Sequence, residues 1–479
     1  MTKRPLNLDP DRFFPPEDRV RTIARELYAT VSDLPIISPH GHTDPAWFAS
    51  NAPFSDAASL LVVPDHYVLR MLYSQGVRLE DLCVPRRDGT TSTDTRAAWR
   101  LFAKHFHLFR GTPTRAWFDH VFSEVFGFDY QLDAGTADAY YDTITEALAT
   151  PAYRPRAILD RFKVEFLATT EGALDPLDHH GTLNADGWGD RIVTTFRPDD
   201  VLDPARVGLA ERLDRLAVLT GERTDTWEGY LRALRVRRAF FKVMGAKATD
   251  HGHPTARTAN LSVTECRALF DRVRLPSPSP EDCELFRAQM LTEMAGMSLD
   301  DGLVMQLHPG SFRNHNPALF AQFGTDKGAD IPVATNYVDA LKPLLDKHGN
   351  NADLTLIVFT LDETTYAREL APLTGHYPCL RLGPPWWFHD SPEGMMRFRQ
   401  QVTETAGFYN TAGFNDDTRA LLSIPARHDL ARRMDCRYLA GLVAEGRLDA
   451  DEAFDLAFEL TDRLVRDAYK LDSRPTGMD

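Results

Sequence analysis

The sequence predicts an α/β protein built on a closed (β/α)8 barrel of the TIM type, with a helical insert after the first strand. Three observations predict this fold. Short apolar runs alternate with long helical stretches over most of the 479 residues, as parallel strands with helical crossovers require. Eight such runs can be counted, which is the number that closes a barrel. An open doubly wound sheet shares the alternation, but no glycine-rich phosphate loop follows the first run, as an open dinucleotide-binding fold would need.

The elements can be assigned in order along the chain. An amphipathic helix is expected within residues 17–35, where four apolar residues recur at helical spacing: Val20, Ile23, Leu27 and Val31. The first strand lies in LPIISPH, and the helical patterns that follow contain no convincing strand. Three parts are therefore predicted: the N-terminal helix and first strand (1–42), a helical insert or cap (43–160), and the rest of the barrel with C-terminal helices (161–479).

Seven further apolar runs supply the remaining strands of the barrel. They are residues 165–172, 191–198, 239–252, 303–310, 353–360, 379–385 and 412–417. The last run is weak by itself and is included partly because it completes the count. In LPSPSPEDC, Ser279, Pro280 and Asp282 stand where a helix cap, a first-turn proline and a capping partner belong, so a helix is expected to begin there.

The composition is that of an ordinary globular enzyme with an acidic surface. Lys and Arg total 54 against 69 Asp and Glu, a formal net charge of -15, which argues against non-specific nucleic-acid binding. A local arginine cluster could still bind a small anion. The five scattered cysteines form no C-x-x-C pair, as is typical of reduced intracellular proteins. Since no signal-peptide or membrane-spanning run is found either, we expect a cytoplasmic protein with no membrane partner.

Ionisable side chains gather at the C-terminal ends of the predicted strands, where barrel enzymes place their chemistry. They are His40 and His42, Glu171, Arg197, Asp250 and His251, His308, and Asp416, Asp417 and Arg419. A polar residue after one strand means little, because every strand must end in solvent. Such groups at the same end of at least five strands indicate one shared mouth.

The H-x-H pair after the first strand is the strongest candidate for a metal site. Residues two apart in a strand face the same side, so His40 and His42 can reach one point. Neutral imidazole is a common ligand of first-row metals, although H-x-H also arises by chance or as a hydrogen-bonded pair. Asp417, favoured over Asp416 because Arg419 follows two positions later, would supply a carboxylate from the last strand. We expect these three residues, His40, His42 and Asp417, to hold one divalent ion.

For other candidate residues, a purely structural role is an alternative to the functional one. Arg197 could bind a carboxylate through its guanidinium fork, or be a surface residue after a strand. His66 and Tyr67 in the insert could reach the site, or Tyr67 could pack behind a capping aspartate. Trp386 in WWF could line a sugar pocket or belong to an aromatic core.

Taken together, the motifs resemble the uronate isomerases of the amidohydrolase superfamily over nearly the whole chain. The resemblance is carried by SPHGH, PDHY, TTFRPD, LHPGSFRNHN, GPPWWFHDSPEGM and FNDDTRALLSIPARHD. It implies a barrel of the metal-dependent hydrolase type and interconversion of D-glucuronate with D-fructuronate, and of D-galacturonate with D-tagaturonate. A single metal ion is expected, because the sixth strand, in LIVFT, lacks the histidine of two-metal relatives. Zinc is the default identity, since ligation by two nitrogens and one oxygen suits zinc or another first-row divalent ion.

The resemblance also implies roles for individual residues. His40, His42 and Asp417 match metal-binding positions, and five further residues match the substrate site: His66, Tyr67, Arg197, His308 and Arg419. Arg313 and Trp386 lie in matching motifs and are expected to contact the substrate. One departure is that the usual T-T-D-D-P reads Thr169-Thr170-Glu171-Gly172 here, which leaves open whether Glu171 or Asp175 takes the usual place.

The implied reaction moves a proton from C2 to C1 of an open-chain sugar acid through an enediolate. Arg197 would hold the C6 carboxylate, Arg419 would lie near the enediolate oxygens, and Asp417 is favoured over Tyr67 as the base, because a free tyrosine titrates near pH 10. Two alternatives remain: a mononuclear metal-dependent hydrolase of the same superfamily, and a non-catalytic acidic-sugar binding protein. The expected partner is a hexuronate, and whether the chain forms a homo-oligomer is open.

Overall fold

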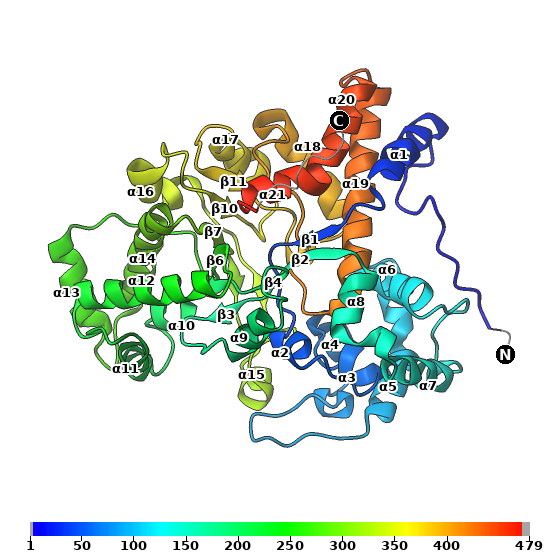
Figure 1. The fold of residues 1–479 in the computed structure, drawn as a ribbon, viewed down its shortest axis with the longest axis horizontal. Helices are drawn as coiled ribbons and strands as arrows, with labels where there is room; N and C mark the ends of the chain where they lie inside the picture. Colours follow the sequence, from blue (N-terminus) through cyan, green and yellow to red (C-terminus); the bar gives the residue numbers. More distant parts are fainter. Residues whose placement is uncertain (1–2, 472–479) are drawn as a thin grey trace.

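The computed structural model describes residues 3–471, and within them parallel strands form the centre of the molecule (Figure 1). The central strands are β1 (Ile36–Ser38), β2 (Val164–Ala168), β3 (Glu171–Gly172), β4 (Ile192–Val193), β5 (Phe196–Arg197), β6 (Ala248–His251), β7 (Val304–Leu307), β10 (Leu356–Val358) and β11 (Leu380–Leu382). They pair in the orders β1-β2-β4 and β11-β10-β7-β6-β5-β3, always in parallel. Because β2 runs into β3 and β4 into β5 with two residues between them, the two ladders are parts of one curved sheet whose strands follow chain order.

The ring is completed by a segment that is almost devoid of regular strand. Residues 411–418 lie between β11 and β1: Thr411 bridges Leu382 in parallel, and the His42 amide donates to the Thr418 carbonyl at 2.9 Å. The predicted (β/α)8 barrel is therefore confirmed, but its eighth strand is reduced to a single bridge. The sequence NDD disfavours strand structure, since Asn and Asp hydrogen-bond to nearby backbone instead.

One predicted strand is shorter in the structure, and its first residues are helical. Of residues 239–252, only β6 is a strand, because α12 (Trp227–Val243) extends through Ala239, Phe240 and Phe241. The buried residues Tyr230, Leu234 and Phe241 recur at helical spacing, so the apolar run AFF continues the buried face of the helix.

Helices surround the strands. The first helix is α1 (Asp18–Val31), as predicted. Between β1 and β2 come α2 (Pro45–Ser50), α3 (Ala57–Leu61), α4 (His66–Tyr73), α5 (Thr95–His105), α6 (Pro113–His120), α7 (Ala137–Leu148) and α8 (Pro155–Arg161). Their core is aromatic, with Trp99, Phe102, Phe106 and Phe122 buried and in ring contact. This core continues into the barrel through Ile36 and Val164 and into α15 (Pro317–Phe323) through Leu319 and Phe323.

The remaining helices connect the later strands and close the chain. They are α9 (Asp178–Ala185), α10 (Asp199–Leu202), α11 (Leu209–Thr220), α12, α13 (Val263–Val273), α14 (Pro280–Asp301), α15 (Pro317–Phe323), α16 (Val338–His348), α17 (Ala371–Thr374), α18 (Pro392–Ala406), α19 (Ile424–Ala444), α20 (Ala450–Phe458) and α21 (Leu464–Ala468). A short hairpin, β8 (Ser311–Phe312) with β9 (Ile331–Pro332), follows β7. As predicted, Ser279 caps α14 by accepting from the Asp282 amide at 3.0 Å. None of the helices within residues 3–471 has the length and apolar character to span a membrane.

Candidate active site

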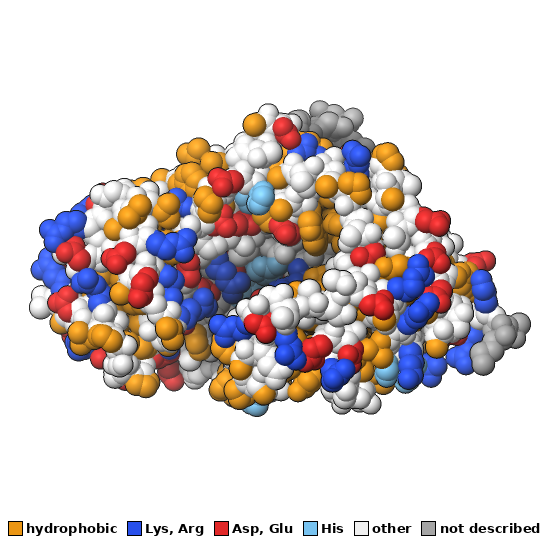
Figure 2. Space-filling model, turned by 90° about the horizontal axis from the view of Figure 1, so that it is seen from below, with side chains coloured by type: hydrophobic (Ala, Val, Ile, Leu, Met, Phe, Trp, Pro, Cys, Tyr) orange, Lys and Arg blue, Asp and Glu red, His pale blue; other side chains and the backbone are white. Residues whose placement is uncertain are grey.

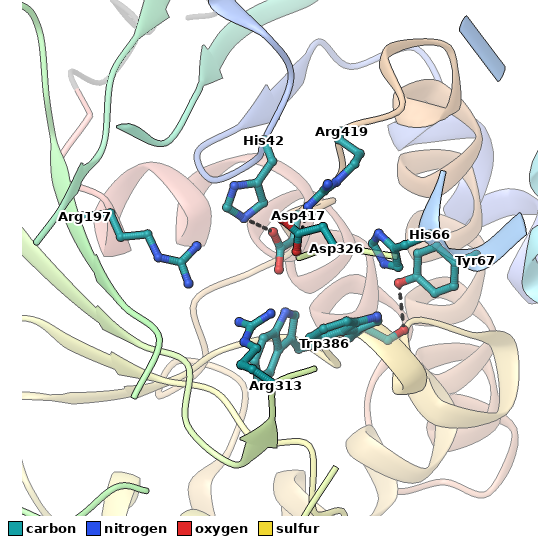
Figure 3. A pocket seen from close by; sticks show the side chains of 10 residues that line it. His42, His66, Tyr67, Arg197, Arg313, Asp326, Trp386, Asp417 and Arg419 are labelled. Carbon is teal, nitrogen blue, oxygen red and sulfur yellow. Dashed lines mark hydrogen bonds and ion pairs between the residues drawn. The ribbon is translucent and has the colours of Figure 1, made fainter. Parts of the chain in front are cut away.

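A cavity of about 130 Å³ lies beyond the C-terminal ends of the barrel strands. Its lining residues come from the loop after β1, from α4, from the end of β5, from the loops after β7 and β11, and from the closing segment and the residue that follows it. They are His42, His66, Tyr67, Arg197, Arg313, Asp326, Trp386, Trp387, Asp417 and Arg419 (Figure 3). Figure 2 shows one face of the molecule hollowed near its centre, where basic and histidine side chains gather. Four of the predicted strand-end groups, His42, Arg197, Asp417 and Arg419, therefore meet at one mouth, and the insert contributes His66 and Tyr67 to it.

His40, His42 and Asp417 converge on one point. The Nε2 atoms of His40 and His42 lie 3.3 Å and 3.1 Å from Asp417 Oδ1, yet this oxygen has no hydrogen-bond partner among residues 3–471. Ligands bound about 2.1 Å from a tetrahedral ion lie about 3.4 Å apart, so the spacing suits a shared cation. Two imidazole nitrogens and a carboxylate oxygen are donors that a divalent first-row metal prefers, and the group fits such an ion.

The local backbone and charge prepare Asp417 for this position. Its φ of 39° is left-handed, a conformation that non-glycine residues adopt at a cost and that is frequent at functional sites. Burial opposes ionisation, but His40 and His42 hold the pKa of Asp417 well below its usual range. Asp416, in contrast, accepts from His428 Nε2 at 3.0 Å and has a structural partner. The structure thus places Asp417, rather than Asp416, beside the histidines.

His308 and Arg197 are joined through Asp250 at the end of β6. The Nδ1 atom of His308 lies 2.7 Å from Asp250 Oδ1, and Arg197 Nη1 lies 3.4 Å from Asp250 Oδ2. His308 stacks on His40 with ring centroids 4.8 Å apart, and burial lowers its pKa. Its Nε2 atom has no partner within the described chain, and His308 forms with His40 and Asp417 a group that could also ligate a metal. His308 therefore lies between the metal group and the pocket wall.

Arg197 is held firmly with its guanidinium facing the cavity (Figure 3). Its Nε atom donates to Asp199 Oδ2 at 3.2 Å, in addition to the Asp250 contact. Burial opposes the charge, but these two carboxylates raise the pKa of Arg197 further above its usual value. The arginine is thus a fixed cation, rather than a mobile surface residue.

His66 and Tyr67 lie in the first turn of α4 because Asp65 caps this helix. Asp65 Oδ1 accepts from the Tyr67 amide at 2.8 Å, and the two rings stack with centroids 4.5 Å apart. The Tyr67 hydroxyl donates to the Trp387 carbonyl at 3.2 Å, and burial raises its pKa. Burial lowers the pKa of His66 to about 3. At neutral pH, both side chains are therefore uncharged. Both interpretations of this segment apply, because Tyr67 packs behind the capping Asp65 and also lines the cavity together with His66.

Two more arginines reach the cavity from other sides. Arg313, after β8, pairs with Asp330 at 2.9 Å, and Arg419 lies 3.6 Å from Asp326. Trp386 is buried, contacts the ring of His308 at 4.8 Å between centroids, and still lines the cavity. It is at once a core aromatic and a pocket residue.

Several residues of the site were not singled out from the sequence. Asp326 lines the cavity, and so does Trp387 of the WWF motif that could line a sugar pocket; their φ values of 61° and 53° are left-handed, and no local pattern indicates that conformation. Arg427 pairs with the buried Asp390 behind Tyr67. Its guanidinium lies 5.5 Å from the centre of the Tyr67 ring. The ARHD motif contains Arg427, but only the folded chain reveals its partner.

The strand-two loop contains a buried acid. Glu171 is buried, accepts from the Thr194 hydroxyl, and has its pKa raised to about 8 by burial. Asp175, the other candidate for this position, instead accepts from the Leu177 amide at 2.7 Å in a local turn. Neither residue lines the cavity.

Glu171→Gln is expected to change how the stability depends on pH. Because the folded protein holds the Glu171 proton up to about pH 8 and the unfolded chain releases it near pH 4.5, stability falls as pH rises through that window. Removing the acid should make the variant more stable than the parent by about 4–5 kcal/mol at pH 8.5, and by little at pH 4.5. Urea unfolding at both pH values measures this difference. Glu171→Asp keeps the carboxyl group and serves as the control; parallel pH profiles of parent and Gln variant would contradict the assignment.

Known proteins share this fold and sequence. The glucuronate isomerase family model matches residues 19–469. A uronate isomerase of Xanthomonas axonopodis pv. citri (strain 306) is 64% identical over 97% of this chain and 99% of its own length. The crystal structure of glucuronate isomerase from Caulobacter crescentus superposes with a TM-score of 0.97 at 61% identity, covering 99% of both chains. That of uronate isomerase from Thermotoga maritima has a TM-score of 0.89 at 27% identity, covering 97% of this chain and 99% of its own.

Proposed function

The chain belongs to the glucuronate isomerase family, and from this premise we propose that it interconverts D-glucuronate with D-fructuronate and D-galacturonate with D-tagaturonate. The enzyme class is that of an aldose–ketose isomerase acting on hexuronates. One observation supports the substrate most directly: Arg197, Arg313 and Arg419 enter one small cavity beside a group of metal-ligand character. A sugar acid offers the carboxylate that a guanidinium fork binds and the oxygens that a metal polarises.

In the proposed complex, Arg197 binds the C6 carboxylate of the open-chain sugar. Asp250 and Asp199 already fix its orientation, so little side-chain entropy is lost on binding. Arg419 lies across the cavity, where its charge would stabilise the enediolate oxygens as they become negative. Preorganised charge of this kind is usually the largest contribution to such a reaction.

We assign proton transfer between C2 and C1 to Asp417. Its Oδ1 atom lies between the two imidazoles, and we propose that its second oxygen takes the C2 proton and returns it to C1. His66 is neutral and its Nε2 has no partner among the residues that the structure describes, so it can form a hydrogen bond with a sugar oxygen as charge develops there. The divalent ion that His40, His42 and Asp417 would hold, which we propose is zinc, supplies Lewis acidity toward a sugar oxygen when bound.

Tyr67 is proposed to be a hydrogen-bonding group and not the base, because its raised pKa keeps the phenol protonated. Tyr67→Phe keeps the ring stack on His66 and is expected to lower kcat/KM about tenfold, as the loss of one neutral hydrogen bond would. Loss of a general base would cost about 10²–10⁴-fold. Steady-state kinetics of the variant between pH 6 and 9 distinguish a hydrogen-bonding role of Tyr67 from a role as base. A fall in kcat/KM of about 10³-fold or more would make Tyr67 the base.

The activity itself is tested with the purified, metal-replete protein in D₂O. D-glucuronate and D-galacturonate are supplied separately, and proton NMR follows ketose formation and C–H exchange. Conversion to the keto-acid would establish the isomerase and show which epimer it prefers. If neither C–H exchange nor ketose formation is seen with either sugar, the proposal is overturned. Turnover of amides or lactones would then favour a hydrolase.

We further propose that the protein acts in the cytoplasm on a small acidic sugar. Support comes from the five cysteines, all buried and unpaired, as expected where thiols remain reduced. The net charge of -15 makes a nucleic-acid partner an unfavourable alternative.

A further inference from the structure

The sequence H-G-H occurs twice in this chain, and the second copy also follows a barrel strand. The first is His40-Gly41-His42, and the second is His251-Gly252-His253 at the end of β6. Asp250 and His251 are neighbours in β6, so their side chains face opposite sides of the strand. Asp250 groups with His40 and His42, while His251 groups with His253 and Asp199. The second H-G-H therefore belongs to a separate cluster behind β6.

Three ligand atoms in this cluster are buried without a partner. Asp199, His251 and His253 are 4%, 0% and 5% exposed. Asp199 Oδ1, His251 Nδ1 and His253 Nε2 have no hydrogen-bond partner among residues 3–471. Ligand atoms of the three residues lie within 4.8 Å of one another, and His253 Nε2 is 4.0 Å from Asp199 Oδ1. Burying a polar atom without a partner costs about 1–3 kcal/mol, so three at one point call for a common ligand.

Neighbouring groups hold two of these side chains in the orientation that a metal site requires. His251 Nε2 is hydrogen-bonded to the Thr249 hydroxyl at 3.0 Å, which leaves Nδ1 facing the cluster. Asp199 Oδ2 accepts from the Gly252 amide at 3.0 Å and from Arg197, which leaves Oδ1 free. Metal-binding histidines and carboxylates in proteins characteristically use their second heteroatom in this way.

The glycine between the two histidines is required by close packing. A Cβ atom at Gly252 would lie 2.3 Å from Arg197 Nη2 and 2.9 Å from Asp199 Oδ2. Only glycine permits Asp199 to approach the backbone between His251 and His253 closely enough to accept from the Gly252 amide. The sequence of this turn thus serves the convergence of the three side chains.

The surrounding charges favour a cation. Arg197 pairs with Asp199 and Asp250, and Arg287 pairs with two further acids near His253, namely Asp203 and Glu284. Arg206 also pairs with Asp203, so four carboxylates surround three guanidiniums and leave one negative charge in excess. The surplus of negative charge, in a region closed to solvent, stabilises a divalent cation that neutral imidazoles can ligate.

We propose that Asp199, His251 and His253 form a second, structural site for a divalent first-row cation such as Zn²⁺, separate from the group at His40, His42 and Asp417. The donor set is again two imidazole nitrogens and one carboxylate oxygen. The 4.0 Å separation exceeds the spacing of about 3.4 Å around a tetrahedral ion, so the site closes by about 0.6 Å on binding. The bound ion fixes Asp199 and, through Asp199 Oδ2, the orientation of Arg197 in the active-site cavity.

The test counts ions per chain. Protein expressed with Zn²⁺ is dialysed against metal-free buffer, and zinc is measured by mass spectrometry against protein concentration. We expect two zinc ions per chain in the parent, one in His253→Asn, and one in the matched control His42→Asn, which lacks a ligand of the first group. A single zinc in the parent, or two in His253→Asn, would overturn the proposal.

A second measurement needs no variant. Crystals of the zinc-loaded parent should give an anomalous difference peak between Asp199, His251 and His253 at the zinc absorption edge, beside the one at His40 and His42. Density for water alone, without an anomalous signal, would show that hydrogen bonds satisfy these atoms and would also overturn the proposal. Both readouts are independent of uronate turnover, so failure of the isomerase assignment would leave this result unaffected.

Discussion

Asp417→Asn is expected to lower kcat/KM for the uronate by about 10³–10⁵-fold and to release the metal of the first group. The change removes the negative charge that lies 3.1–3.3 Å from two imidazole nitrogens and replaces it with an amide, a poorer ligand for a divalent ion. It also removes the group proposed to move the proton, which by itself contributes about 10²–10⁴-fold. Kinetics with D-glucuronate and zinc content per chain measure the two losses in the same preparation.

The adjacent carboxylate provides a matched control. Asp416→Asn alters the hydrogen-bond partner of His428, which is not one of the proposed metal ligands. The variant should have a lower free energy of unfolding but should keep the metal and the activity that depends on Asp417. If Asp416→Asn lost the metal and Asp417→Asn kept it, the assignment of the two neighbours would be reversed. Thermal unfolding of both variants separates loss of fold from loss of the ion.

Arg197→Met is expected to raise KM for uronates by about 10²–10³-fold, with a smaller fall in kcat. Truncating one partner of a buried, hydrogen-bonded charge pair costs about 2–5 kcal/mol, and here the bound carboxylate would lose its guanidinium. Part of the cost is internal, because Asp199 and Asp250 would be left without their cation. KM and kcat are measured for D-glucuronate. The ratio of uronate turnover to neutral-aldose turnover is measured as well, and this ratio should decrease in the variant.

Arg197→Lys separates charge from geometry. Lysine keeps the cation but loses the planar fork, so KM should fall between those of the parent and the Met variant. Unchanged KM and kcat in Arg197→Met would show that the carboxylate binds elsewhere, and Arg313 would then be the first residue to examine.

The barrel could be predicted from the sequence because its signal is repeated along the chain. Alternation of apolar runs and helices does not depend on any single run, so the prediction survived two local errors. The short apolar run AFFKV predicts a strand but is helical in the structure, because periodicity over so few residues cannot distinguish a strand from the buried face of a helix. Residues 412–417 were expected to form the eighth strand, but they contain no regular strand. The backbone of NDDTR instead places Asp417 and Arg419 in the cavity.

The candidate site was predictable where chemistry follows strand ends and unpredictable where it depends on the path of loops. His40, His42, Arg197 and His308 each follow a strand, so their meeting follows from the barrel. Asp326 and Trp387 reach the cavity through left-handed backbone that tertiary packing imposes on non-glycine residues. The second H-G-H was visible in the sequence, but only the structure shows that Asp199, from the FRPD motif, completes it.

The closing segment has a consequence for local stability. One backbone hydrogen bond, from His42 to Thr418, joins residues 411–418 to the β1 side of the barrel within the described chain, whereas β1 is joined to β2 by a three-residue ladder. Such a seam opens at lower free energy than the rest of the ring, and its amides should exchange with solvent first. His40 and His42 lie on one side of this seam and Asp417 on the other. An ion bound there links the first strand of the barrel to the closing segment. Loss of the metal and local opening of the contact between these two segments are therefore expected to occur together.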